Sequence, residues 1–321
     1  MEINSNQKRS FFLYFLLTFA FISLCSTWRV NAQYYYYNDR FYDAPVLFEL
    51  GGSVGAMNSL TDLGGNKGPG KKFVKDLNFG NTELVSGLYF GAMYHEIIGL
   101  RLEANFGKVS AYDSILSAVA PSNLARMRYN RNLSFSSNIT EISLMAEFHP
   151  LQLLKNRDNN DNSSYFSPYV LAGIGYFTFN PQASLNGRMV DLQPLRTEGQ
   201  GFAQYPDRKP YNLHSISFPI GAGVKYDISP LVNLRTEVIY RITQTDYLDD
   251  VSTTYIDKSL FQTNGFTGTK LSNALLLTDR QLGEFPRLSR PGRNRGNAGN
   301  NDSFFSFNFK LGISIGRQSV K

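Results

Sequence analysis

The chain has 321 residues and a formal net charge of +6, and 42% of its residues are hydrophobic, 14% aromatic and only 18% charged. Its 25 Phe and 19 Tyr supply ample apolar surface for burial, which argues against a disordered chain. Only one stretch approaches the roughly 18 consecutive apolar residues of a membrane-spanning helix, so a helical membrane protein is disfavoured and the many aromatic residues and glycines favour short strands.

The N-terminal residues have the pattern of an export signal. Lys8 and Arg9 precede an apolar run over residues 11–25, and a polar stretch then ends on the small residue Ala32. A basic start, an apolar centre and a small residue at the cleavage position are typical of a secretory signal peptide. We therefore expect residues 1–32 to be a signal peptide.

The following segment, residues 33–321, is expected to be the exported domain. The alternatives are a membrane anchor, for which the apolar run is short, and a lipoprotein signal ending at Cys25, where Leu24 replaces the small residue required. Cys25 is the only cysteine, so the exported domain can form neither disulfides nor thiolate metal sites. The signal carries three cations and one anion, and the remaining net charge of +4 does not indicate nucleic-acid binding. Export without cysteine fits the periplasm or the outer membrane of a diderm bacterium, and we expect the outer membrane.

Eight segments of the exported domain alternate between apolar and polar residues, as strands with one apolar face do. The segments are 46–57, 84–95, 100–107, 141–148, 168–179, 213–226, 234–242 and 305–315. Most are close to the roughly 9–11 residues with which a tilted strand crosses a bilayer, and their number is even, as in outer-membrane barrels. Pro219 is expected to need a bulge or a local gap in its strand.

The lengths of the connections separate a membrane barrel from a soluble sandwich. The second and third strands, and the sixth and seventh, are joined by a few residues, whereas three other connections have roughly 25 to 35 residues and the last has about 60. Residues 150–167 are an intermediate exception. Long outer loops opposite short periplasmic turns are typical of outer-membrane barrels. We therefore predict an all-β fold, an eight-stranded antiparallel up-and-down transmembrane β-barrel with long outer loops, and keep a soluble β-sandwich as the alternative.

The polar faces of these strands carry five cations and four anions. They are Arg101, Glu103, Glu141, Glu147, Lys225, Arg235, Glu237, Arg241 and Lys310. Eight strands enclose a space that side chains fill, and an isolated charge buried there would be very unfavourable. We expect a cross-strand charge network that plugs the barrel, with outer-membrane lipids around the apolar face. A proton or ion path through these charges is the alternative.

Few side chains suggest catalysis or metal binding. His214 lies beside Ser215 and Ser217 near the outer end of a strand, where a lipid-modifying barrel enzyme would place a base next to a nucleophile. This pattern is weak, so we predict no enzymatic activity and no cofactor. Four acidic residues just beyond the seventh strand offer oxygen ligands that suit calcium, but their spacing matches no EF-hand and we prefer a solvated acidic loop. They are Asp246, Asp249, Asp250 and Asp257.

Two further segments suggest contacts with partners. A basic stretch over residues 280–295 suits a lipopolysaccharide phosphate or an acidic partner, although a solvated loop is the preferred interpretation. Four tyrosines follow the predicted cleavage position, and we expect them on the periplasmic side, either in an interfacial belt or as a docking strip for a periplasmic partner. They are Tyr34, Tyr35, Tyr36 and Tyr37.

Several loop motifs resemble the outer-membrane barrel family that includes PorG, a component of the type IX secretion system. They are Tyr176-Phe177-Thr178-Phe179-Asn180-Pro181, Asp191-Leu192-Gln193-Pro194-Leu195, Thr197-Glu198-Gly199-Gln200-Gly201, Thr245-Asp246-Tyr247-Leu248-Asp249-Asp250-Val251-Ser252 and Arg295-Gly296-Asn297. The resemblance implies a barrel without a catalytic role that anchors or scaffolds the periplasmic ring of the lipoprotein PorK and its partner PorN. The alternative function is a general surface barrel of adhesin or porin-like type.

Overall fold

The computed structural model of the chain describes residues 41–65, 78–118, 125–153, 166–283 and 289–319. The predicted signal peptide, residues 1–32, lies outside this part of the chain, and so do Tyr34, Tyr35, Tyr36 and Tyr37. Within the described part no helix is both long and apolar enough to cross a membrane.

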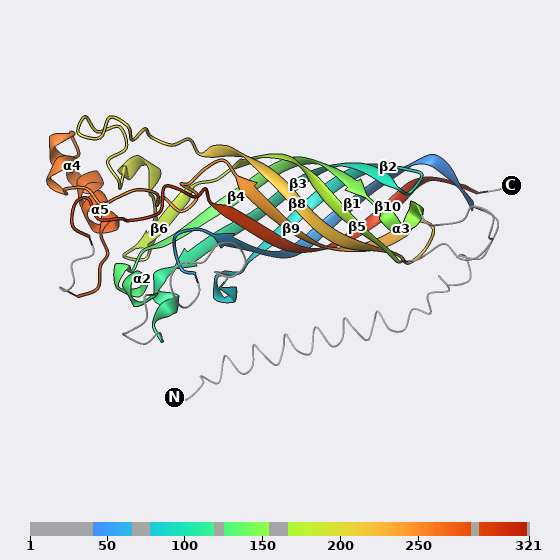
Figure 1. Ribbon diagram of the computed structural model, residues 1–321, viewed down its shortest axis with the longest axis horizontal. Coiled ribbons are helices and arrows are strands. Elements are labelled where there is room, and N and C mark those ends of the chain that lie inside the picture. The colour runs from blue at the N-terminus through green and yellow to red at the C-terminus, as the bar shows by residue number, and fades with distance from the viewer. Residues whose placement is uncertain (1–40, 66–77, 119–124, 154–165, 284–288, 320–321) are drawn as a thin grey trace.

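Eight long antiparallel strands form a closed barrel (Figure 1). They are β1 (Phe41–Leu60), β2 (Glu83–Tyr94), β3 (Ile98–Tyr112), β4 (Ser134–Phe148), β5 (Phe166–Thr178), β8 (His214–Asp227), β9 (Val232–Thr243) and β10 (Ser303–Ser319). Each pairs with the next long strand in the chain, and β1 pairs with β10 to close the sheet, with Gly51 opposite Gly312. The predicted eight-stranded up-and-down barrel is therefore confirmed, and the β-sandwich alternative is wrong because the sheet closes on itself.

Connections of different length lie at opposite ends of the barrel. At one end, His95 and Glu96 both have positive φ, at 49° and 59°, and form the short turn between β2 and β3. The short β8–β9 turn and the helix α3 (Pro150–Leu153) lie at this end too (Figure 1). We call it the short-turn end and the opposite one the long-loop end.

Several further helices and strands lie mostly at the long-loop end (Figure 1). The alternation of apolar and polar residues in the sequence did not predict them. They are the hairpin strands β6 (Pro181–Leu185) and β7 (Arg188–Asp191), the helices α2 (Ala125–Arg131), α4 (Ser259–Thr263) and α5 (Gly268–Thr278), and the 3₁₀ helices η3 (Phe79–Asn81), η4 (Asp113–Leu116) and η5 (Gln193–Leu195). The β6–β7 hairpin extends β4 through a short ladder. The described parts of the long connections are thus folded structure.

The two faces of the barrel wall have opposite polarity. On β3 the outward Leu100 and Leu102 are 54% and 51% exposed, whereas the inward Arg101 and Glu103 are 2% and 1% exposed. The same alternation runs along the other long strands. An apolar band around the whole exterior is far larger than the surface of a water-soluble protein tolerates, but it matches the lipid-facing band of a membrane barrel.

The predicted irregularity at Pro219 is present. The β5–β8 ladder pairs Gly175 with Ser217 and resumes with Ala172 opposite Ile220, without pairing Pro219 in between. Because proline has no backbone N–H to donate, the gap is expected at this position.

An apolar core closes the long-loop end of the barrel. Phe177 of β5 and Phe304 of β10 pack edge to face inside the barrel mouth, with ring centroids 5.5 Å apart. The same cluster of buried side chains extends to Phe202, Phe261 and Phe266 of the loops, whose rings contact one another. The loops and the mouth of the barrel therefore share one hydrophobic core.

Candidate functional site

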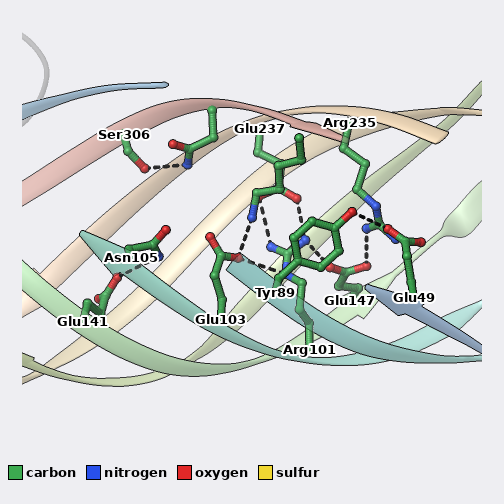
Figure 2. A network of polar contacts seen from close by, with 12 residues as sticks. Glu49, Tyr89, Arg101, Glu103, Asn105, Glu141, Glu147, Arg235, Glu237 and Ser306 are labelled. Carbon is green, nitrogen blue, oxygen red and sulfur yellow. Dashed lines mark hydrogen bonds and ion pairs between the residues drawn. The ribbon is translucent and has the colours of Figure 1, made fainter. Parts of the chain in front are cut away.

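The nine charged residues predicted for the interior all point into the lumen. Each is less than 10% exposed, and Figure 2 shows the centre of the network that most of them form. The set is Arg101, Glu103, Glu141, Glu147, Lys225, Arg235, Glu237, Arg241 and Lys310.

Arg101 is the centre of this network. Its guanidinium lies 3.1 Å from a carboxylate oxygen of Glu103, 2.5 Å from Glu147 and 2.6 Å from Glu237. Lys310 contacts two of the same carboxylates, with its Nζ 3.0 Å from Glu237. These residues come from β3, β4, β9 and β10, so the ion pairs join different walls of the barrel (Figure 2).

Glu49 completes the network and was not predicted. Its Oε2 lies 2.7 Å from Arg235 and 3.6 Å from Lys225, while Arg235 also reaches Glu147 at 2.8 Å. With Glu49 the lumen holds five buried carboxylates and five buried cations. The alternation of β1 contained the signal, because Glu49 lies between the outward-facing Phe48 and Leu50.

A second ion pair lies nearer the long-loop end. The Nε of Arg241 is 2.6 Å from Oε2 of Glu141, and Arg241 also donates to Ser306 at 2.8 Å. Ser217 donates to the other carboxylate oxygen of Glu141 at 2.7 Å. The Arg241 guanidinium lies over the Phe304 ring, so the charged network meets the apolar core of the loops here.

Two tyrosines that sequence reasoning missed donate to the network. The Tyr89 hydroxyl donates to Glu49 at 2.6 Å, and the Tyr169 hydroxyl donates to Glu237. Gly51 leaves room for the Tyr89 ring, because a Cβ at position 51 would lie 2.5 Å from a ring carbon. An inward-facing glycine in a strand indicates that a bulky group packs against it, and this is the sequence feature that could have identified Tyr89.

The lumen is filled as well as neutralised. The void beside Glu49, Tyr89, Arg101 and Arg235 has a volume of about 10 Å³, which is room for about one water molecule. Buried charges with close partners are held in fixed positions, and removal of one partner leaves the other uncompensated. Side chains therefore fill this part of the lumen.

Three of the family-like loop motifs meet at one buried ion cluster. Arg295 Nη1 lies 3.1 Å from Oε1 of Glu198, and its Nη2 lies 3.5 Å from Oδ2 of Asp250. Thr197 donates to the same Asp250 oxygen at 2.5 Å, and the backbone N–H of Ser252 donates to Glu198 at 3.0 Å. Motifs about 50 residues apart in the sequence are thus joined in space.

Arg131 connects this cluster to the remaining long loops. Its Nε lies 2.8 Å from Asp113, while its terminal nitrogens donate to the backbone oxygens of Arg295 at 2.8 Å and Asp62 at 2.7 Å. All four long connections therefore meet at six residues, which we call the loop hub. The loop hub consists of Asp62, Asp113, Arg131, Glu198, Asp250 and Arg295.

The four acidic residues named as weak calcium ligands do not gather around one point. Asp250 is engaged by Arg295, Asp257 is exposed and accepts from the backbone of Ser259, and Asp249 accepts from the backbone of Val251. Among the described residues no group of three His, Cys, Asp or Glu side chains is placed to hold a metal ion.

The interpretation of these loops as solvated is wrong at several positions. Asp249 and Asp250 are 1% and 0% exposed, Asp246 is half-buried, and only Asp257 is exposed. In the basic stretch, Arg295 is 3% exposed because it forms the loop hub. Sequence spacing could not show this, since the counter-charges come from other loops.

His214 and the neighbouring serines do not form a catalytic pair. His214 is exposed on the outer face, where its ring packs against Tyr176, whereas Ser217 is buried in the lumen and donates to Glu141. Ser215 and His214 are adjacent in one strand and so point to opposite faces. The arrangement that the enzyme alternative requires is absent at this position.

We expect the loops around Asp246 to lose stability as the pH rises. Burial raises the pKa of Asp246 to about 7, helped by the nearby charges of Asp62 and Glu198, and burial raises the pKa of Asp250 to about 6. An unfolded Asp titrates near pH 4. The folded loops therefore hold protons that the unfolded chain releases, and their free energy of unfolding falls between about pH 4 and pH 7.

Limited proteolysis checks this dependence. The long loops should be cleaved more slowly at pH 5 than at pH 8, after correction for the intrinsic activity of the protease. Asp246→Asn should flatten the profile, whereas Asp257→Asn, at an exposed position, should not. A profile that is flat in the unaltered protein would contradict the assignment.

Of three comparisons with known proteins, only the one with solved structures found similar chains. No family model matches the chain, and no curated protein matches it. The N-terminal β-barrel domain of Pseudomonas aeruginosa OprF is 10% identical, with 85% of this chain and 100% of that chain covered and a TM-score of 0.32. Neisserial surface protein A is 11% identical, with coverages of 85% and 98% and a TM-score of 0.35. A major outer membrane protein from Thermus thermophilus is 11% identical, with coverages of 85% and 100% and a TM-score of 0.37.

Proposed function

We propose that the chain is a non-enzymatic anchor of the bacterial outer membrane that holds a folded loop assembly at the cell surface. The observation that carries this proposal is the occluded lumen, in which ten paired charges and an apolar cap occupy the space that a channel would need. The apolar exterior supplies the membrane contact, and the long-loop end supplies ordered surface. An anchor of this kind works through its surfaces at the two ends.

A planar-bilayer recording tests the anchor against a porin-like barrel. The purified protein should insert without steady ohmic conductance, because eight strands leave a lumen that side chains fill. A wide porin inserted from the same detergent serves as the positive control. Stable conductance steps from the unaltered protein would contradict the proposal and favour the porin-like alternative.

We further propose that this anchor serves type IX secretion as a scaffold for PorK/PorN-like ring proteins. The support is the resemblance of the loop motifs to the PorG-like family, together with the convergence of three of these motifs on the loop hub. The charges of these motifs pair across loops, so the loss of one charged residue would leave its partner buried and unpaired. The proposed docking strip is Tyr34, Tyr35, Tyr36 and Tyr37, which the sequence predicts on the periplasmic side of the membrane.

Photo-crosslinking from the tyrosine strip tests the secretion role. A photoreactive residue at Tyr35 should capture a periplasmic ring protein, whereas one at the exposed Lys258 in the loops should not. Deletion of the gene should also block export of type IX cargo. Unchanged export and no ring protein captured from Tyr35 would favour the alternative, a general surface barrel that acts through its loops.

A further inference from the structure

A polar cavity lies at the rim of the barrel, beside the loop hub. Its volume is about 700 Å³, within the usual range of small-molecule sites. The walls come from the ends of β1 and β10, from residues 61–65 and 78–81 of the first long loop, from Arg128 and Arg131 of α2, and from residues 294–302. Tyr240 also borders it from the outward face of β9, where it lies between the exposed Val238 and Ile242 and donates to Ser303 at 2.9 Å. The cavity therefore begins where the apolar outer face of the barrel ends.

Amide side chains are the main chemical feature of the wall. Each carries one carbonyl acceptor and an NH₂ group with two donors, which is the combination that matches neighbouring hydroxyl groups of a sugar. Of the described residues, six asparagines line the cavity: Asn78, Asn81, Asn294, Asn297, Asn300 and Asn301.

Asn81 is held in place with an unused acceptor. It is 3% exposed, and among the described residues nothing donates to its Oδ1. Asn78 caps the 3₁₀ helix that carries Asn81 by accepting from the Gly80 N–H at 3.1 Å. Gly64, with a φ of 72°, packs against the same amide, because a Cβ there would lie 2.7 Å from Asn81 Nδ2. A buried acceptor without a donor is unfavourable unless a ligand or solvent supplies one.

The charged groups at the cavity already have partners, Arg128 among them. Arg131 and Arg295 belong to the loop hub, Asp62 accepts from the Asn297 N–H at 2.6 Å, and Asp302 accepts from the Leu248 N–H at 2.9 Å. An anionic or cationic ligand would have to compete with these contacts. The amides and hydroxyls that remain favour a neutral ligand with many hydroxyl groups.

We propose that this cavity binds a neutral saccharide, either free or as part of the headgroup of a glycolipid in the outer leaflet. Such a ligand would donate to Asn81 Oδ1 and exchange hydrogen bonds with the exposed amides of Asn294 and Asn300. Tyr240 lies where the lipid-facing wall ends at the long-loop end, so both a free saccharide and a glycolipid headgroup could reach the cavity. This site adds a ligand to the anchor proposed above and does not depend on type IX secretion.

Ligand-observed NMR with maltotriose tests the saccharide chemistry. The protein is purified from outer membranes in lauryldimethylamine oxide, because maltoside detergents carry the probe's own sugar. Maltotriose should bind saturably at or below about 10 mM. Asn81→Ala should weaken binding by about 3- to 10-fold, the effect of one hydrogen bond, and Asn300→Ala, at an exposed position, should weaken it without affecting folding. Asn273→Ala, in α5 and outside the cavity, is the matched control.

A second measurement distinguishes the two sources of the sugar. Native mass spectrometry of the same preparations counts retained lipopolysaccharide. Retention that falls in the Asn81→Ala/Asn300→Ala double variant but not in Asn273→Ala supports the glycolipid headgroup, and maltotriose binding without retention supports a free saccharide. The proposal is overturned if the double variant behaves like Asn273→Ala in both assays, if neither sugar source binds, or if inorganic phosphate displaces the maltotriose.

Discussion

Arg101→Ala should destabilise the barrel by about 3–5 kcal/mol, the cost of leaving buried charges without their partner. Arg101 is 2% exposed and contacts Glu103, Glu147 and Glu237 within 3.1 Å. Without its guanidinium, three carboxylates share the remaining cations in a space with little water. Equilibrium unfolding in urea, followed by the shift in cold SDS gel electrophoresis between folded and unfolded chains, measures the loss.

Two variants separate charge from shape at Arg101. Arg101→Ala/Glu237→Gln removes one cation and one anion together, so it should recover at least about 1 kcal/mol of the stability that Arg101→Ala loses. Arg188→Ala, at an exposed position of β7, should change stability by less than about 0.5 kcal/mol. If Arg101→Ala were as mild as Arg188→Ala, the lumen would have to be wet and the network unimportant.

Arg295→Ala should open the long loops while the barrel stays folded. The change leaves Glu198 and Asp250 buried without their cation, at a local cost of about 3–5 kcal/mol. It also removes the donor to the Asp250 backbone oxygen. The Arg295 side chain forms no contact in the described strand ladders of the barrel, so the barrel itself should still fold. Hydrogen exchange over residues 245–256 should therefore accelerate sharply, with little change in the eight long strands.

Arg293→Ala is the matched control for this experiment. Arg293 is exposed, lies two residues away and carries the same charge, so its removal should leave exchange in the loops unchanged. Equal acceleration in both variants would mean that overall charge governs the loops. No acceleration in Arg295→Ala would mean that the apolar core of the loops suffices without the loop hub.

The barrel could be predicted from the sequence because the residue types along each strand depend on whether the side chain faces lipid or the lumen. Alternation with period two, as in Leu100, Arg101 and Leu102, reports which side chain meets lipid and which meets the lumen. Connection lengths then gave the end at which each loop lies. The fainter alternation near Glu49 was sufficient to place a strand but not to identify its one inward charge.

The folded loops could not be predicted in this way. The hub residues Glu198, Asp250 and Arg295 lie in three segments with no periodic pattern, and their burial depends on contacts between segments about 50 residues apart. The helix α5 is short and packs against η5 and β6, so its stability also comes from distant partners. The acidic and basic runs therefore suggested solvated loops. In the structure, their opposite charges pair with one another inside the loop assembly.

The most direct measurement of the central claim is the environment of spin labels along β3. Cys25 lies in the predicted signal peptide, so single cysteines can be placed at Leu100, Leu102 and Phe106 in a background without cysteine. In lipid vesicles, labels at these outward positions should be relaxed by dissolved oxygen and shielded from a water-soluble nickel chelate. A label that replaces Lys108, near the long-loop end, should show the opposite preference. Nickel access at Leu100, Leu102 and Phe106 would contradict a membrane-spanning barrel.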